Sequence, residues 1–170
     1  MRVLRYILVT ILLFVILTGC DNNKQGNNIV RFYYCTTESA YGRDDGLFTY
    51  EDRHISYAKN EYAKLIEEYL NGAKSAGCTS PFPGGTTLSD FNFRDNTATI
   101  VLSPHMALQS QANVITCCAC LCQTLFTLDD IESISISIEG TQINGENELT
   151  FHKGSFTIWD DVSNDITTQP

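Results

Sequence analysis

The sequence predicts an α+β fold, in which two helices pack on one face of a mostly antiparallel sheet. Two segments place apolar residues at steps of three and four, which is the spacing of an amphipathic helix. Around them lie short runs of β-branched and aromatic residues, bounded by glycine, proline, asparagine and aspartate, as is typical of strands and turns. The order strand, short strand, helix, hairpin, helix and strand gives a layered α+β domain.

The first part of the predicted domain holds two strands and a helix. Residues 29–35 read Ile-Val-Arg-Phe-Tyr-Tyr-Cys and predict the first strand. A turn rich in glycine and aspartate at 41–46 precedes a short second strand within 47–55. Helical spacing runs over 55–70, and Asn71-Gly72 ends this helix because both residues tolerate the left-handed conformation.

A connector and a hairpin come next. Residues 80–85, Ser-Pro-Phe-Pro-Gly-Gly, exclude both a helix and a central strand. Strands are predicted at 86–93 and 97–102, and the intervening Arg94-Asp95-Asn96 favours a tight turn between them.

The last part of the predicted domain holds the second helix and up to two strands. Apolar residues and cysteines on one side of 109–128 predict the helix. Isoleucine and serine then alternate over 131–138, which predicts a strand with one buried and one solvent-exposed face. A short final strand is expected within 149–159.

The amino-terminal residues predict export and lipidation. Two arginines precede an apolar run of 11 residues at 7–17, which is too short to span a bilayer as a stable helix. Residues 17–20, Leu-Thr-Gly-Cys, resemble the bacterial lipoprotein signal. We therefore expect a signal peptide at 1–19 and acylation of Cys20 by diacylglycerol, with palmitate-type chains.

The composition of the remaining chain limits the number of its domains and the kinds of partner it can bind. The predicted parts are an acylated cysteine with a flexible polar tether at 20–28, one domain at 29–159 and a polar tail at 160–170. From Asp21 onward, 9 basic residues (11 less Arg2 and Arg5) face 20 acidic ones, a net charge of about −11. This charge disfavours nucleic acid and leaves membrane affinity to the lipid anchor. The expected location is the extracytoplasmic face of the cell membrane.

Five motifs occur in a characteristic order. The first three are an aromatic strand at 30–34, a Leu-containing helix that ends in glycine at 63–72, and a Ser-Pro-x-Pro-x-Gly-Thr loop at 80–86. The last two are a strand that ends in a hydrophobic residue and serine at 100–103, and Thr124-Leu125 followed by the alternating strand and glycine at 134–140. Over roughly 29–140, this order resembles the GerMN domain of bacterial sporulation and spore-germination proteins. The chain departs from the family's usual pattern at Ala73, where proline is frequent, at Val101, where aspartate is frequent, and in the cysteines of its second helix.

The resemblance implies a non-enzymatic, often lipid-anchored envelope module that supports assembly of sporulation or germination complexes. No position of the family pattern is catalytic, and no cofactor is implied. The implied partners are the membrane through the lipid anchor, envelope or sporulation proteins, or peptidoglycan. The binding surface would be a sheet face or an exposed sheet edge.

Cysteines are the other chemical candidates. The second helix carries four, Cys117, Cys118, Cys120 and Cys122. Four thiolates can bind zinc or an iron–sulfur cluster, but at about 100° per residue they do not share one face of a helix. Two readings therefore stay open beside the metal site: buried cysteines as small hydrophobic residues, or disulfides in an oxidising compartment. The first disulfide to test joins Cys35 with Cys78, because both lie outside this helix.

Other side chains are less specific. His54, His105 and His152 show no ligand spacing, and the paired carboxylates lack the spacing of a calcium loop. No local motif marks a cysteine nucleophile, so we expect no enzyme. Three functional classes remain: a non-catalytic interaction module, a metal- or redox-active lipoprotein using the second helix, and a small-ligand-binding lipoprotein.

Overall fold

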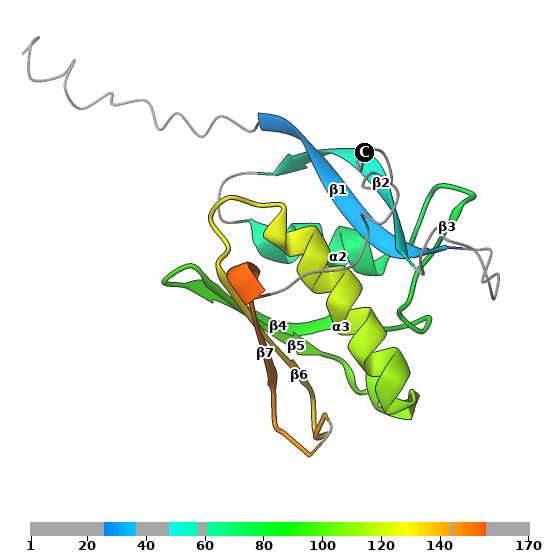
Figure 1. The fold of residues 1–170 in the computed structure, drawn as a ribbon, viewed down its shortest axis with the longest axis vertical. Coiled ribbons are helices and arrows are strands. Elements are labelled where there is room, and N and C mark those ends of the chain that lie inside the picture. Colours follow the sequence, from blue (N-terminus) through cyan, green and yellow to red (C-terminus); the bar gives the residue numbers. More distant parts are fainter. Residues whose placement is uncertain (1–25, 37–47, 58–60, 144, 156–170) are drawn as a thin grey trace, which may run out of the picture.

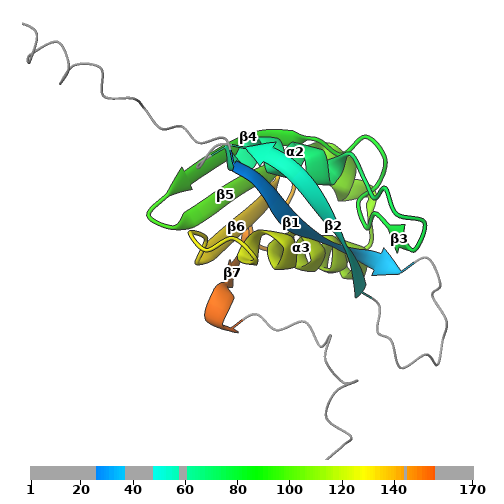
Figure 2. The same ribbon diagram turned by 90° about the horizontal axis from the view of Figure 1, so that it is seen from above.

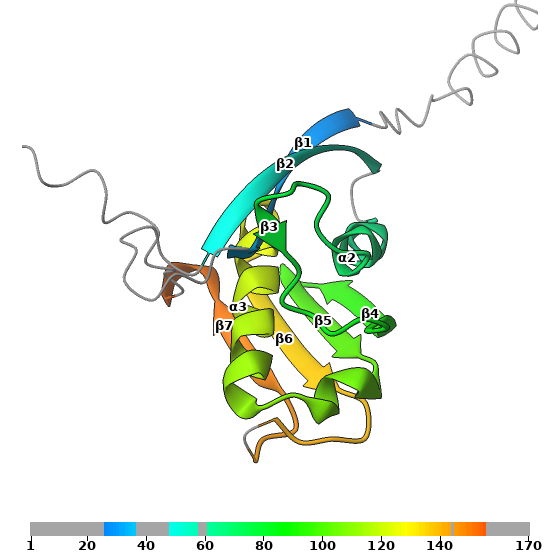
Figure 3. The same cartoon turned by 90° about the vertical axis from the view of Figure 1, so that its right-hand side faces the viewer.

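In the described part of the chain, the strands form two sheets and the α-helices lie between them (Figure 1, Figure 3). The computed structural model describes residues 26–36, 48–57, 61–143 and 145–155. One sheet has the strand order β2-β1-β3 and the other the order β4-β5-β6-β7. Strand pairing is antiparallel except between β5 and β6. The α+β class and the mostly antiparallel pairing are confirmed, and the helices cover one face of each sheet.

The elements follow the chain in the order that the sequence predicts, with short additions. The strands are β1 (Gly26–Thr36), β2 (Phe48–Tyr57), β3 (Cys78–Thr79), β4 (Leu88–Arg94), β5 (Thr97–Leu102), β6 (Ser133–Ile138) and β7 (Leu149–His152). The α-helices are α2 (Tyr62–Leu70) and α3 (Gln111–Phe126), and the short 3₁₀ helices are η1 (Pro104–Leu108) and η2 (Lys153–Ser155). Strand β3 and the 3₁₀ helices η1 and η2 are too short to show a periodic pattern and were not predicted.

The pairing of β1 with β2 begins earlier in the chain than the side chains suggested. Gly26 pairs with Tyr57, so residues 26–28 of the predicted tether belong to β1. Ile55, predicted to begin the first helix, lies in β2 opposite Asn28. Both differences have one cause, because the hydrogen-bond ladder of a strand pair extends through polar residues that apolar periodicity does not detect.

The hairpin between β4 and β5 turns on two residues. Asp95 and Asn96 have φ angles of 51° and 59°, a left-handed pair that matches the twist of the flanking strands. Arg94 pairs with Thr97 across this two-residue loop, as the Arg-Asp-Asn sequence predicts.

The connection from β5 to β6 runs through α3 and makes these two strands parallel. Ser110 caps α3 by accepting a hydrogen bond from the backbone N–H of Asn113 at 3.3 Å. The isoleucines of β6 are buried against the helices, as predicted. The prediction that its serines are exposed is only partly right, because Ser135 is 9% exposed and its hydroxyl lies 2.9 Å from that of Thr150 in β7.

The core lies in the helical layer, where each helix meets both sheets. Along α2, Tyr62, Leu65, Ile66 and Tyr69 are buried, and in Figure 2 β1 and β2 pass over the helices. Figure 3 places the four-stranded sheet on the opposite side of this layer. Within the described part of the chain, no helix has the length and apolar content needed to cross a membrane.

Candidate interaction surface

The outer face of the three-stranded sheet presents an exposed group of side chains. Residues alternate between the two faces of a strand, so the residues next to the buried Val30 and Phe32 point away from the helices. The register places Ile29 opposite His54, Arg31 opposite Asp52 and Tyr33 opposite Tyr50. We call this group the outer patch: Ile29, Arg31, Tyr33, Tyr50, Asp52 and His54.

The centre of the outer patch is an arginine held between an aromatic ring and a carboxylate. Arg31 donates to both carboxylate oxygens of Asp52, at 2.9 and 3.1 Å, and its guanidinium carbon lies 3.8 Å from the centre of the Tyr50 ring. The hydrogen bond from Arg31 lowers the pKa of Asp52. An exposed ion pair of this kind contributes at most about 1 kcal/mol to stability.

Apolar and aromatic area surrounds this pair. Ile29 is 64% exposed and Tyr50 is 47% exposed, and the rings of Tyr33 and Tyr50 lie 5.9 Å apart. Tyrosine and arginine are enriched among the residues that dominate protein interfaces, and tyrosine offers a large area at low entropic cost.

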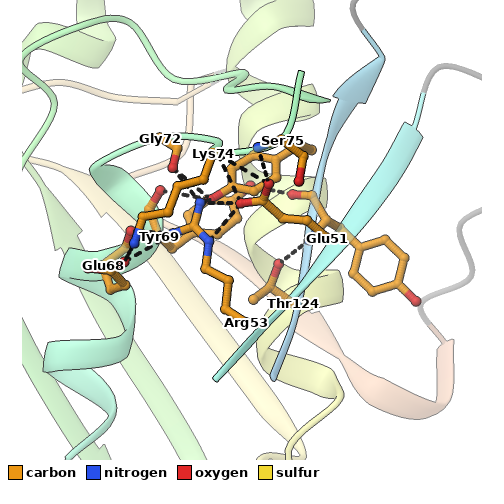
Figure 4. A network of polar contacts seen from close by, with 10 residues as sticks. Glu51, Arg53, Glu68, Tyr69, Gly72, Lys74, Ser75 and Thr124 are labelled. Carbon is orange, nitrogen blue, oxygen red and sulfur yellow. Dashed lines mark hydrogen bonds and ion pairs between the residues drawn. The ribbon is translucent and has the colours of Figure 1, made fainter. Parts of the chain in front are cut away.

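A buried polar network lies on the opposite face of the same strands (Figure 4). Glu51 and Arg53 are two residues apart on β2, are 7% and 8% exposed, and form an ion pair. Two charges on the buried face of a strand are rare unless each is paired and hydrogen-bonded. The sequence analysis did not identify Glu51 and Arg53 as buried. The available signal was their spacing of two, which places both on the same face of a strand.

Arg53 binds the carboxyl end of α2. Its guanidinium donates to the backbone oxygen of Gly72 at 2.6 Å, to that of Glu68 at 3.2 Å and to the hydroxyl of Tyr34 at 3.0 Å. These carbonyls have no partner within the helix, and the carboxyl end of a helix favours a positive charge. Arg53 therefore fastens α2 to the three-stranded sheet.

Glu51 binds the segment that follows α2. Its carboxylate accepts hydrogen bonds from the backbone N–H of Lys74 at 3.1 Å and of Ser75 at 2.6 Å, besides those from Arg53. Burial alone would raise the pKa of Glu51, but the hydrogen bonds from Ser75, Lys74 and Arg53 outweigh it and lower the pKa to about 2. The ionised carboxylate is thus the form that the fold requires.

This pKa predicts acid sensitivity. A carboxyl group whose pKa is lowered by folding contributes stability above its unfolded pKa of about 4.3, and that contribution is lost as the pH falls toward the folded value. We expect the free energy of unfolding to decrease between about pH 4.5 and pH 2, and to decrease less steeply in Glu51→Gln. Urea unfolding at each pH measures the two slopes. Equal slopes in the two proteins would contradict the assignment to Glu51.

The edge of β1 that faces α3 is partly capped by side chains. The N–H of Tyr33 donates to the hydroxyl oxygen of Thr124 at 2.9 Å, and the carbonyl of Tyr33 accepts from the hydroxyl of Tyr69 at 2.7 Å (Figure 4). A peptide cannot add as a further strand where both backbone groups are already bonded. At Tyr33 this edge of β1 is therefore closed to an added strand.

The predicted cysteine sites are separated by the structure. Cys20 lies outside the described residues. Cys35 pairs with Thr79 and Cys78 with Thr36, so the side chains of Cys35 and Cys78 leave opposite faces of the sheet. Both are free thiols in the structure.

The four cysteines of α3 are buried as thiols. Burial raises the pKa of Cys117 and of Cys118 to about 12, and that of Cys122 well above its usual value. Metal ligation and nucleophilic attack both need the thiolate. In the described part of the chain, no three histidine, cysteine or acidic side chains come together in a way that would hold a metal ion. The geometry thus favours packing for these four cysteines.

Two of the surface hollows lie beside strands. One, of about 320 Å³, lies between β2 and α2 beside Ser56, Lys64 and Glu67, and another, of about 450 Å³, lies beside Val101 and Ser137. Neither contains a buried polar side chain left without a hydrogen bond, because the described residues contain no such atom.

The fold is similar to that of two solved structures from Bacillus subtilis. The tandem GerMN domains of the sporulation protein GerM match with a TM-score of 0.54 and 17% identity, covering 76% of this chain and 46% of that chain. The first GerMN domain of GerM matches with a TM-score of 0.53 and 17% identity, covering 81% of this chain and 98% of that chain. This chain thus spans about half the length of the tandem structure. At this identity the likeness concerns the fold.

The sequence itself identifies the family. No curated protein matches the chain. The family model Germane, described as sporulation and spore germination, matches residues 31–144, which is more than half of the 170 residues. The resemblance to GerMN domains noted in the sequence is thereby confirmed, and the chain belongs to the Germane family of sporulation and spore germination.

Proposed function

We propose that this protein is a non-catalytic interaction module, held at the outer side of the cell membrane by acylated Cys20, that binds an envelope protein in sporulation or spore germination. The observation that carries the proposal is the outer patch, in which exposed Ile29 and Tyr50 flank the Arg31–Asp52 pair on a rigid sheet. Membership of the Germane family supports a role in sporulation or spore germination. In the described residues, no three histidine, cysteine or acidic side chains come together as a metal site, and the thiols of α3 are buried.

The length of chain after Cys20 supports a partner close to the membrane. β1 begins at Gly26, six residues beyond Cys20. At about 3.3–3.6 Å per residue, these six residues reach at most about 20 Å. A lipid on Cys20 therefore keeps the outer patch near the membrane, where an integral membrane protein or its external domain can reach it.

A protein partner fits the outer patch better than peptidoglycan does. The patch combines aromatic, aliphatic and cationic groups around one internally neutralised ion pair, which is the composition of the centre of a protein interface. The mature chain carries about −11, which disfavours an approach to anionic phospholipid, so the lipid anchor has to provide the membrane affinity.

Site-specific photocrosslinking in the native host tests this function. A benzoyl-phenylalanine placed at position 50, in the outer patch, is expected to give a discrete adduct with a membrane-associated protein. The matched control is the same group at Thr150, which is exposed on the outward face of β7 in the other sheet. Adducts at position 150 but none at position 50 would remove the outer patch from the proposal.

A second arm of the same experiment tests the anchor. In Cys20→Ala, the protein is expected to leave the membrane fraction and the adduct at position 50 is expected to disappear. Lipidation would be refuted if Cys20→Ala stayed in the membrane fraction and the amino-terminal peptide of the unsubstituted protein carried no acyl mass. The crosslink at position 50 would then test the binding surface independently of the anchor.

A further inference from the structure

Strand β2 forms a long edge of the three-stranded sheet. It has 10 residues, and in the described part of the chain its neighbour in the sheet is β1 alone. The ladder between the two strands runs from the pair Gly26–Tyr57 to the pair Cys35–Phe48 without a bulge. An edge strand presents N–H and carbonyl groups that can pair with a strand of another chain. The other side of β2 is therefore a surface on which a further strand can add.

The bonds of Tyr33 establish which backbone groups of β2 face this edge. The N–H and carbonyl of Tyr33 are both bonded to side chains of the helical layer, so they point away from β2. Tyr33 lies opposite Tyr50, and the two residues therefore form a pair without mutual backbone hydrogen bonds. Because the pattern alternates, the N–H and carbonyl groups of Tyr50, Asp52, His54 and Ser56 all point to the edge.

The contacts of α2 agree with this direction and leave the edge open. The ammonium group of Lys64 donates to the carbonyl of Ser56 at 3.4 Å, so this carbonyl points out of the sheet. A hollow of about 320 Å³ lies between residues 54–56 of β2 and the side chains of Lys64 and Glu67, so the helix does not fill the space beside the edge. Among the described residues, the backbone groups of Asp52 and His54 have no hydrogen-bond partner on this side.

The outer strands of the four-stranded sheet differ from β2. In β4, a bulge lies between Leu88 and Asp90, and the carboxylate of Asp90 accepts the N–H of Phe91 at 2.9 Å. Bulges of this kind oppose the addition of a strand, and β7 has only four residues. Along its 10 residues, β2 contains neither a bulge nor a proline. Its inward charges, Glu51 and Arg53, are paired with each other, so a neighbouring strand would leave neither without a partner.

The side chains along the edge of β2 are complementary to themselves. When two copies of a strand pair antiparallel about a two-fold axis, each contact occurs twice with its members exchanged. One register places Asp52 of each copy opposite His54 of the other. The adjacent registers place two Asp52 or two His54 side chains opposite each other, and like charges in that position are destabilising. Both copies carry about −11, so a register with a further contact between carboxylates is disfavoured.

The carboxylate of Asp52 can accept a further donor. Arg31 donates one hydrogen bond to each of its oxygens, at 2.9 and 3.1 Å. An ionised carboxylate offers about four acceptor positions, and an imidazole N–H is a donor. His54 of a second copy can therefore bind Asp52 without displacing Arg31.

We propose that two copies of this chain pair through β2, as antiparallel strands with Asp52 of each copy opposite His54 of the other. The two three-stranded sheets then form one continuous sheet. The two-fold axis is perpendicular to this sheet, so the outer patches of both copies face the same side. The inference does not rest on the proposed function, because the pairing uses the backbone edge of β2 and needs only a second copy.

Photocrosslinking between two tagged copies of the full chain in the native host tests the proposal. Copies with two different epitope tags are co-expressed, each with benzoyl-phenylalanine at position 56, which the register places opposite Tyr50. The expected product carries both tags, and trypsin digestion places the bond on peptide 44–53. With the group at Thr150 on β7 instead, no product with both tags is expected. An adduct from position 56 to a different protein, with none to a second copy, would overturn the proposal.

Variants of the two facing residues test the register. Asp52→His and His54→Asp each place two like side chains opposite each other, and each is expected to lower the yield of the product with both tags about tenfold. The double variant Asp52→His/His54→Asp is expected to restore the yield, because both pairs form again with their members exchanged. A double variant that stays as low as the single variants would refute this register.

A proline variant tests the backbone pairing. The N–H of His54 points to the edge, so His54→Pro removes no bond of the ladder between β1 and β2, and circular dichroism is expected to show a folded protein. The missing donor and the proline ring block an added strand, so the product with both tags is expected to disappear. A product that persists in folded His54→Pro would refute pairing through β2.

Discussion

Replacing Arg53 with methionine is expected to lower the free energy of unfolding by about 3–5 kcal/mol, since it breaks a buried ion pair and leaves one charge behind. Arg53 donates to Glu51, to the carbonyls of Glu68 and Gly72 and to the hydroxyl of Tyr34. Methionine keeps much of the side-chain volume but none of these donors. The carbonyls at the end of α2 then have no charged partner, and Glu51 loses its counter-ion.

The matched control is Arg31→Met on the other face of the same sheet. Arg31 also pairs with a carboxylate, but its side chain is 41% exposed, so the loss is expected to stay within about 1 kcal/mol. Urea unfolding followed by circular dichroism measures both variants. The double variant Glu51→Gln/Arg53→Met should be less destabilised than the sum of the single variants, because no unpaired charge remains. An Arg53→Met protein as stable as Arg31→Met would show that the network does not hold the sheet.

Replacing Tyr69 with alanine is expected to cost about 3–5 kcal/mol, and it is the core substitution with the largest expected effect. Its ring is fully buried where α2 meets β1, stacked on Tyr34 at 4.9 Å and on Phe32 at 5.6 Å, with the edge of Phe82 at 5.8 Å. Alanine leaves a cavity among three rings, and such a site collapses poorly because two of the rings are held on β1 and the third on the segment between β3 and β4.

Tyr69→Phe separates packing from hydrogen bonding. The ring contacts remain, but the carbonyl of Tyr33 loses the hydroxyl at 2.7 Å, which costs about 1–3 kcal/mol if the carbonyl stays buried. Thermal and urea unfolding measure both variants. If phenylalanine destabilised the protein as much as alanine does, the hydroxyl rather than the ring would be the main contribution of Tyr69.

The sequence predicts elements well where one face of an element is buried. The isoleucines of β6 and the apolar positions of α2 fall on the faces that the structure buries, and Asp95-Asn96 forms the expected turn. Each of these signals is local: a period, a turn residue or a helix stop. The family resemblance follows from the order of the same local signals.

The separation into two sheets is not a local property. Nothing within β1 or β4 specifies that they belong to different sheets, because that depends on the helices that pack between them. The parallel pairing of β5 with β6 likewise follows from the crossover through α3. The periodicity of a segment predicts which of its residues are buried, but not which other element covers them.

The candidate sites were predictable to different extents. The sheet face was expected as a binding surface, but its residues needed the register of β1 with β2. Glu51 and Arg53 read as ordinary surface charges until their burial is known. For Cys35, sequence position selected Cys78 as the partner to test first, whereas the register of β1 with β3 turns the two side chains to opposite faces of the sheet.

The bond between Tyr33 and Thr124 also constrains the order of folding. These residues are 91 positions apart, so β1 can pair with β2 before the helix that caps its edge is in place. Until α3 packs against it, the aromatic strand around Phe32 presents an uncapped edge. Uncapped strand edges favour aggregation, so α3 protects the chain as well as completing the core.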